Sequence, residues 1–382
     1  MSKQIKEASK KRRRTGFFIF EIVVLLVLIA GLIVFAKLQG ALENIGDAEI
    51  DRKNIGVNEG INRDVLKGYT NIALIGLDTR EGGDDGVTSG LSNSDTMMII
   101  SIDHDAKEVK MVSIYRDTFL NIGEDTYTKA NAAYPRGKEE RLLTMINKNM
   151  DMDIMDYVTL NFKSVINAVD ILGGIDDVDL TRDEIIHLNN YCRGTAQETG
   201  VTFNPIPEQT GTYNLDGMQA LSYARIRYGN GLDFRRAARQ RLVIDKMVQK
   251  AKRANPITLN KLLTEIAQPE YISSSLSPAE MMKMGLDMIS YDFAENGQVG
   301  FPFKHMWGAN VEKALNSDVV LPVTLEANVI ELHKFLYPDA AYAPSETVKE
   351  YSDYIIARSG YGEESIPENS EDGTIPPLPQ ED

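Results

Sequence analysis

Short apolar runs rich in β-branched residues recur from residue 71 onward and predict the strands of a buried sheet. Each is bounded by clusters of Gly and Asp, which mark turns. The predicted strands are 71–77, 96–102, 109–114, segments near Val158 and Val178, and 299–303.

Apolar positions spaced three and four residues apart predict helices between these strands. The predicted helices are 138–149, 162–172, 216–221, 234–253 and 325–336, with a further helical section from Pro256 to about Ser290. Strands that alternate with helices predict an α/β fold: a layered α/β/α domain whose central mixed β-sheet is flanked by helices. The pattern leaves open whether this is one large domain or a domain with a helical excursion.

The longest apolar run, 17–36, predicts one N-terminal transmembrane helix. Twenty helical residues span about 30 Å, the thickness of a bilayer core. Residues 1–16 carry seven lysines and arginines against one acid, Glu7. The positive-inside rule therefore predicts a cytoplasmic N-terminus, a single-pass anchor in the cell membrane and an extracellular domain, rather than a cleaved signal peptide.

Composition divides the chain further. We expect a cytoplasmic basic segment at 1–16, the transmembrane helix at 17–36, a stalk at 37–69, a folded extracellular domain at 70–345 and an acidic, largely disordered tail at 346–382. No basic residue follows Arg358, and such a segment buries too little apolar surface to fold. The single cysteine, Cys192, excludes an intramolecular disulfide and fits the surface of a Gram-positive cell.

Arginines gather between residues 225 and 239, although the chain has a formal net charge of −15. Arg225 and Arg227 alternate as neighbours on a strand do, which would point both to one face. Arg236 and Gln240 are four apart and would share one face of a helix. The guanidinium group matches phosphate oxygens two at a time, so the cluster predicts a cradle for phosphate or pyrophosphate. A solvated basic helix is the alternative.

Acids stand at the ends of three predicted strands. Asp78 follows the first, Asp95 precedes the second, and the pair Arg116-Asp117 follows the third. Ligands of open α/β sheets bind at such strand ends, and Mg²⁺ is held by one or two carboxylates together with phosphate oxygens. Taken alone, any one of these acids is better explained as a turn or helix cap, and it is the combination of three acids with two arginines that indicates a site. The four histidines show no ligand spacing, and we expect neither a zinc site nor a Ser-His-Asp triad.

Seven segments in the same order resemble the LytR–CpsA–Psr family of cell-wall glycopolymer transferases. They are IGLDTR (75–80), SDTMM (94–98), SIYRDT (113–118), KANAAY (129–134), LGGI (172–175), LDGMQALSYARIRY (215–228) and DFRRAARQR (233–241). Two positions depart from the family pattern: Asn93 stands where an arginine is frequent, and Tyr115 where a proline is usual.

The resemblance implies a phosphotransferase that moves a glycopolymer, such as teichoic acid or capsule, from a polyprenyl-pyrophosphate carrier to peptidoglycan through a phosphodiester. It implies Mg²⁺, with Mn²⁺ as an alternative, bound by Asp78 and Asp95. It assigns Arg116, Asp117 and Asp233 to catalysis. The residues that it places at the pyrophosphate are Arg80, Arg116, Lys129, Arg225, Arg227, Arg236, Arg239 and Gln240.

Two other functions fit the same residues. One is a membrane-anchored pyrophosphatase that acts on polyprenyl-pyrophosphate compounds, and the other is a non-catalytic regulator of the cell envelope. A nucleic-acid partner is not expected, because only residues 1–16 lie on the cytoplasmic side. A polyprenyl substrate requires a deep apolar pocket beside the arginines, and we expect helices within 138–172 and 241–266 to line it.

Overall fold

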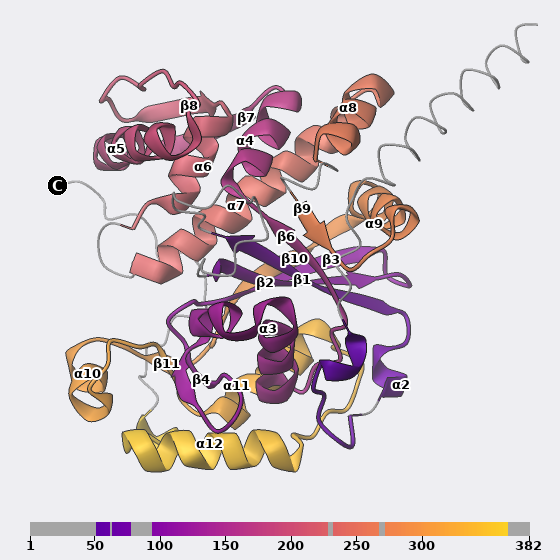
Figure 1. The fold of residues 1–382 in the computed structure, drawn as a ribbon, viewed down its shortest axis with the longest axis vertical. Helices are drawn as coiled ribbons and strands as arrows, with labels where there is room; N and C mark the ends of the chain where they lie inside the picture. Colours follow the sequence, from indigo (N-terminus) through magenta and orange to yellow (C-terminus); the bar gives the residue numbers. More distant parts are fainter. Residues whose placement is uncertain (1–50, 62, 78–93, 228–231, 267–271, 366–382) are drawn as a thin grey trace, which may run out of the picture.

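The structure is a computed structural model that describes residues 51–61, 63–77, 94–227, 232–266 and 272–365. The centre of the described part is a six-stranded sheet in the order β10-β3-β2-β1-β6-β9 (Figure 1). Its strands are β1 (Tyr69–Leu77), β2 (Ser94–Asp103), β3 (Glu108–Ile114), β6 (Asp156–Leu160), β9 (Ile272–Ser274) and β10 (Asp292–Phe301). β1 runs antiparallel to β2 and parallel to β6, which confirms the predicted mixed sheet.

Strand directions bring the candidate residues to one edge of this sheet. Leu77, the last residue of β1, pairs with Ser94, the first residue of β2. β3 is also antiparallel to β2 and so ends at Ile114 on the same side. Asp95 and the turn after β3 therefore meet at one edge, as the sequence predicts. Asp78 and Arg80 lie outside the described residues.

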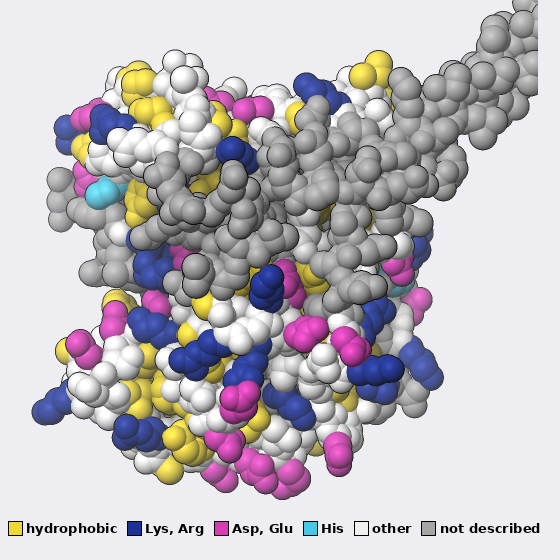
Figure 2. All heavy atoms as spheres, in the orientation of Figure 1, with side chains coloured by type: hydrophobic (Ala, Val, Ile, Leu, Met, Phe, Trp, Pro, Cys, Tyr) yellow, Lys and Arg dark blue, Asp and Glu magenta, His cyan; other side chains and the backbone are white. Residues whose placement is uncertain are grey.

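One face of the sheet is covered by α3 (Tyr134–Met150), α11 (Leu325–Leu336) and α12 (Glu346–Ser359), which lie below it in Figure 1. Ile75 and Ile99 of the sheet share an apolar core with Leu142 of α3. On the face shown in Figure 2, acidic and basic side chains are interspersed over this layer. The layer is thus apolar inside and charged outside, as expected of amphipathic helices.

The other face packs against α7 (Leu232–Arg253) and α9 (Pro278–Ser290). Met98 and Ile100 of β2 point to this side, whereas Met97 and Ile99 point to the α3 side. Because successive strand residues face opposite ways, burial on both faces requires the continuous apolar run seen in the sequence. The layered α/β/α prediction is confirmed for the described residues.

A smaller apolar cluster lies beside α7. It joins α4 (Phe162–Ile171), α5 (Arg182–Thr199), α6 (Gly217–Arg225) and the hairpin of β7 (Ile175–Leu180) and β8 (Gly211–Leu215). Capping boxes begin α5, at Thr181 and Glu184, and α6, at Asp216 and Gln219. The strand predicted near Val178 belongs to this hairpin and not to the central sheet.

Short elements complete the described chain. They are η1 (Arg52–Asn54), α2 (Arg63–Leu66), β4 (Phe119–Asn121), β5 (Tyr127–Lys129), η3 (Ala130–Ala132), α8 (Pro256–Ile266), β11 (His305–Met306), α10 (Ala309–Leu315), β12 (Leu321–Pro322) and η4 (Glu363–Ser365).

Three boundaries differ from the predictions. The prediction of a disordered tail is wrong for residues 346–359, because α12 buries Val348 and Ile355 in the main core. The prediction of a separate stalk at 37–69 is wrong for its last part. Ile55 is buried in the same core, and Asn58 donates a hydrogen bond to Asp151. β9 interrupts the helical section predicted for 256–290.

The predicted transmembrane span, 17–36, lies outside the described residues. Within the part of the chain that the structure does describe, no helix combines the length and apolar character needed to cross a bilayer.

Candidate active site

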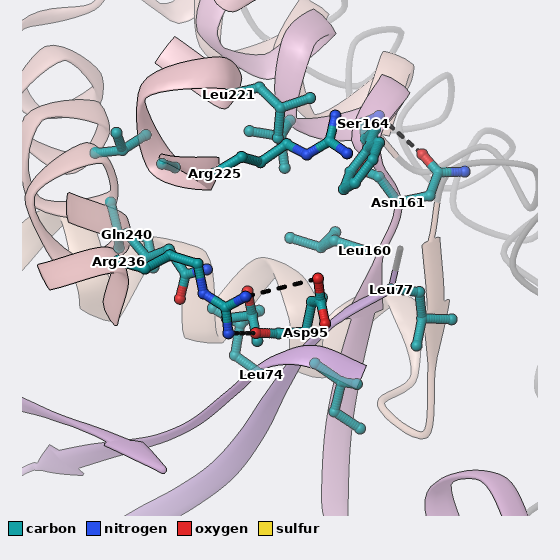
Figure 3. Close-up of a pocket in the computed structure, with 18 of the residues that line it drawn as sticks. Leu74, Leu77, Asp95, Leu160, Asn161, Ser164, Leu221, Arg225, Arg236 and Gln240 are labelled. Atoms are coloured by element: carbon teal, nitrogen blue, oxygen red, sulfur yellow. Dashed lines mark hydrogen bonds and ion pairs between the residues drawn. The ribbon is translucent and has the colours of Figure 1, made fainter. Parts of the chain in front are cut away.

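A cavity of about 380 Å³ lies between the sheet and helices α4, α6 and α7 (Figure 3). Its apolar wall includes Leu74, Leu160, Val165, Leu221, Val243 and Met247. Its polar lining includes Asp95, Arg116, Arg225, Arg227, Arg236 and Gln240. The expected apolar pocket beside the arginines is therefore present. α4 and α7 line it as predicted, but α3 lies on the opposite face of the sheet and no described residue of α8 lines it.

Arg225 lies across the cavity from Arg236 and Asp95 (Figure 3). It is the last residue of α6, so the strand-like alternation predicted for Arg225 and Arg227 is wrong: the capped helix continues past Leu221. Its guanidinium donates to Thr195 Oγ1 at 2.5 Å and lies over the Phe162 ring, 4.2 Å from the centroid. Arg225 is therefore held in place before any ligand binds.

Three arginines converge on two acids at the polar end. Arg116 donates to the Asp95 carboxylate at 2.7 Å, and Arg236 donates to the Asp95 backbone carbonyl at 3.1 Å. Asp233 lies 3.0 Å from Arg227, 3.4 Å from Arg236 and 3.8 Å from Arg116. These contacts hold the guanidinium groups side by side, which is the arrangement that a pyrophosphate requires.

Asp117 joins the same network. Its carboxylate lies 3.2 Å from Lys129 Nζ and 3.6 Å from both Arg116 and Arg227. Four cationic side chains thus face the carboxyl groups of Asp95, Asp117 and Asp233. The excess of positive charge favours an anionic ligand.

Asp117 and Asp233 titrate as a pair. Burial, together with the hydrogen bond to Asp117, raises the pKa of Asp233 to about 6. Burial also opposes ionisation of Asp117, but the hydrogen bond from Asp233 and the charge of Arg116 outweigh it and lower the Asp117 pKa. Below about pH 6 the pair therefore holds one proton, mainly on Asp233.

The fold positions these groups through two short segments. Asp233 lies in the first turn of α7, where the helix dipole also favours an anion, and Arg236 follows one turn later. Arg116 and Asp117 lie in the turn after β3, which Thr118 closes by donating from Oγ1 to the Tyr115 carbonyl at 2.7 Å. The site is thus built on a helix end and a hydrogen-bonded turn.

Arg239 does not belong to this site. Its guanidinium donates to Glu184 Oε1 at 2.8 Å and to the Ile226 carbonyl at 3.1 Å. Three residues beyond Arg236, it faces α5 instead of the cavity, and its predicted pyrophosphate contact is wrong for this reason. Gln240, four residues beyond Arg236, does line the cavity.

Asp95 offers the oxygen donor that Mg²⁺ prefers. It is the only carboxylate among the described residues that line the cavity. In the described ranges no three His, Cys, Asp or Glu side chains come together as a metal site. A divalent ion here would therefore need other oxygen donors beside Asp95, such as phosphate.

Sequence reasoning missed the neighbours of the site from the last third of the chain. The Val320 N–H donates to the Asp117 carbonyl at 2.9 Å, and His305 stacks on Phe234, which follows Asp233. Neither spacing nor composition signals these contacts, because they join segments more than 70 residues apart in the sequence.

Comparison with known proteins identifies the family to which the chain belongs. The LytR_cpsA_psr family profile matches residues 35–310. The chain belongs to the LytR–CpsA–Psr family. Over 221 residues, 56% of this chain and 64% of the relative, it is 33% identical to the Enterococcus faecalis protein named polyisoprenyl-teichoic acid–peptidoglycan teichoic acid transferase TagU. The match thus spans less than two thirds of that protein.

Two further relatives come from Bacillus subtilis. The protein named polyisoprenyl-teichoic acid–peptidoglycan teichoic acid transferase TagT is 25% identical over 83% of this chain and 98% of its own length. The crystal structure of TagV superimposes with a TM-score of 0.53 and 22% identity, covering 73% of this chain and 99% of TagV. The TagV likeness shows that the folds agree.

Proposed function

We propose that this protein transfers a glycopolymer, such as teichoic acid or capsule, from a polyprenyl-pyrophosphate carrier to peptidoglycan through a phosphodiester bond. One observation carries the proposal: a single cavity combines an apolar wall with a basic end. A polyprenyl pyrophosphate has the same division, with a hydrocarbon chain that avoids water and a charged head. The name of the Enterococcus faecalis relative supports the same reaction.

In this proposal the isoprenoid chain lies along α4 and α7, between Val165 and Met247. The pyrophosphate lies at the other end, against Arg116, Arg227 and Arg236. Asp95 and phosphate oxygens would hold Mg²⁺, with Asp78 as the second carboxylate that the family resemblance implies. The ion would supply neutralising charge at the phosphates.

The reaction then needs positioning, charge neutralisation and one proton acceptor. An acceptor hydroxyl attacks the phosphorus that carries the glycopolymer. An oxygen–phosphorus bond forms, the bond to the lipid phosphate breaks, and the lipid leaves as polyprenyl monophosphate. The hydroxyl proton passes to Asp233, whose raised pKa makes it a better base than an ordinary aspartate.

Two other outcomes use the same residues. Water in place of the sugar hydroxyl would make the protein a pyrophosphatase, and binding without chemistry would make it a regulator. The test supplies the full chain in detergent with a lipid-linked polymer, ³²P-labelled in the phosphate nearest the sugar, together with peptidoglycan. The proposal requires label in the peptidoglycan fraction, in amounts that match the polyprenyl phosphate released. Soluble label alone would indicate hydrolysis, and uncleaved but bound lipid would indicate a regulator.

A further inference from the structure

An aromatic cluster borders the acid pair outside the cavity. Tyr115 precedes Arg116, and Phe234 follows Asp233. The rings of Tyr115 and Phe234 meet edge to face with centroids 4.5 Å apart. His305 stacks on Phe234 at 4.3 Å with 24° between the ring planes. Two of these rings thus belong to the segments that carry the arginine and acid of the site.

The cluster ends in an exposed ring, that of Trp307. Its indole is edge-on to Phe234, with centroids 5.9 Å apart, yet the residue is 48% exposed. Gly308 follows with φ +92°, a conformation that favours glycine, so the turn that presents the indole is set locally. An exposed aromatic ring that ends a packed aromatic cluster offers a flat apolar face to a ligand.

The inner rings are fixed relative to the acids. His305 is buried, and its Nδ1 lies 3.2 Å from the Pro302 carbonyl oxygen. Burial lowers the pKa of His305, so the stacked imidazole is neutral at ordinary pH. Val320 and Asp117 share a backbone hydrogen bond, which ties the same part of the chain to the turn after β3. Trp307 therefore packs on a ring, Phe234, that is itself stacked on the buried His305.

The aromatic cluster does not line the cavity. Arg116 and Arg236 line the cavity, whereas Phe234, His305 and Trp307 do not. Asp233 contacts the arginines with its carboxylate and is followed by Phe234 in the chain. An in-line displacement at phosphorus brings the nucleophile in opposite the leaving group. With the lipid phosphate in the cavity, the acceptor must come from outside it, and the cluster lies outside the cavity next to the segments that carry Arg116 and Asp233.

We propose that Trp307, supported by Phe234 and His305, is the acceptor subsite and stacks against an amino-sugar ring of the peptidoglycan glycan strand. This inference rests on the proposed transferase function. A pyranose ring has an apolar C–H face and polar edges, and the flat indole matches that face while its N–H remains free for a sugar oxygen. The donor glycopolymer also contains sugar rings, and the test separates the two.

The first measurement uses the fact that Trp307 is the only tryptophan of the 382 residues. All indole emission of the full chain in detergent therefore comes from this site. Glycan-strand fragments of alternating N-acetylglucosamine and N-acetylmuramic acid should change the emission saturably. Cellohexaose, which lacks the N-acetyl and lactyl groups, should require a higher concentration. Emission that stays unchanged at saturating glycan in the transfer assay would overturn the proposal.

The second measurement separates acceptor from donor. Trp307→Ala should raise the KM for the glycan acceptor roughly tenfold, the effect of losing one aromatic contact, and Trp307→Phe should recover part of it. The KM for the lipid-linked donor should change much less. Leu286→Ala, at an exposed position of α9, is the control and should leave both KM values unchanged. A rise in donor KM alone would assign the ring to the donor polymer and contradict the proposal.

The two hypotheses fail in different ways. If the wild type cleaves no lipid-linked polymer but its emission responds to glycan, the transferase function fails and the glycan site remains. If the wild type transfers polymer normally and Trp307→Ala has the wild-type acceptor KM, the subsite fails and the transferase function remains.

Discussion

Asp117 and Asp233 have the same chemistry, but their surroundings separate them. The hydrogen bond from Asp233 and the charges of Arg116 and Lys129 outweigh burial and lower the pKa of Asp117, whereas the more deeply buried Asp233 retains a proton up to about pH 6. Two neighbouring acids whose pKa values are shifted in opposite directions are a common arrangement for proton transfer. The difference between the two pKa values follows from tertiary contacts. The sequence could therefore suggest both residues but could not show which of them is protonated.

The first prediction concerns pH. Because the pKa of Asp233 is raised, the protonated form persists to about pH 6, and a base must be unprotonated. The transfer rate at saturating donor should therefore rise with pH, with a midpoint near 6. Asp233→Asn should reduce the rate by about 10²-fold or more and remove this midpoint. A wild-type profile that is flat between pH 5 and 7 would contradict the role of Asp233 as the base.

The second prediction concerns Arg227, which faces both acids. Charge-assisted hydrogen bonds contribute on the order of 1.5–3 kcal/mol, so Arg227→Ala should weaken donor binding roughly ten- to a hundredfold. Arg227→Lys keeps the charge without the planar fork and should recover only part of the loss. Arg253→Ala, at the exposed end of the same helix, is the matched control. Equal donor affinities in all three variants would mean that the arginines do not bind the pyrophosphate.

At the scale of elements, two of the buried arginines of α7 have different roles. Arg236 faces the cavity, whereas Arg239 pairs with Glu184 at the start of α5. The sequence predicted α7 and its cavity face well, because that face follows from helical spacing. It could not show that Arg239 turns toward α5, since α5 itself was not predicted.

The third prediction follows from this difference. Arg239→Ala leaves the buried Glu184 carboxylate without its cation and should destabilise the fold by about 3 kcal/mol or more. Donor affinity of the remaining folded protein should stay near the wild-type value. Urea unfolding measures the loss of stability, and titration with the donor measures the affinity. Arg236→Ala is the comparison and should lose donor affinity; an Arg239 variant that is fully stable but does not bind donor would contradict the assignment.

Other elements show why parts of the fold escaped prediction. α12 was assigned to the tail from its acidic composition, yet Val348 and Ile355 are one heptad apart and both are buried. Ile55 likewise has little local signal but enters the same core. By contrast, β1 to β3 were predicted nearly to their ends, because burial on both faces leaves a continuous apolar pattern.

At the scale of the whole molecule, the described domain places an apolar cavity and an aromatic cluster next to one charged centre. This suits a reaction between a membrane lipid and the cell wall. The topology itself remains a prediction from the sequence: N-terminus inside, one span at 17–36 and the domain outside.

The fourth prediction tests that topology. Protease added to intact protoplasts should degrade the domain and leave only a short protected fragment that contains the span. A cytoplasmic protein of the same cells, probed in the same sample, should survive and so report that the membrane is sealed. A domain that is protected until the cells are lysed would contradict the extracellular orientation.

The central claim is that the cavity between α4 and α7 holds a polyprenyl pyrophosphate. The most direct measurement is photo-crosslinking of the full chain with a short polyprenyl pyrophosphate that carries a diazirine on the isoprenoid, followed by peptide mass spectrometry. The cavity predicts adducts near Val165 on α4 and near Val243 and Met247 on α7, with competition by unlabelled lipid. Adducts confined to exposed positions such as Ile257 and Leu286, insensitive to competition, would contradict the claim.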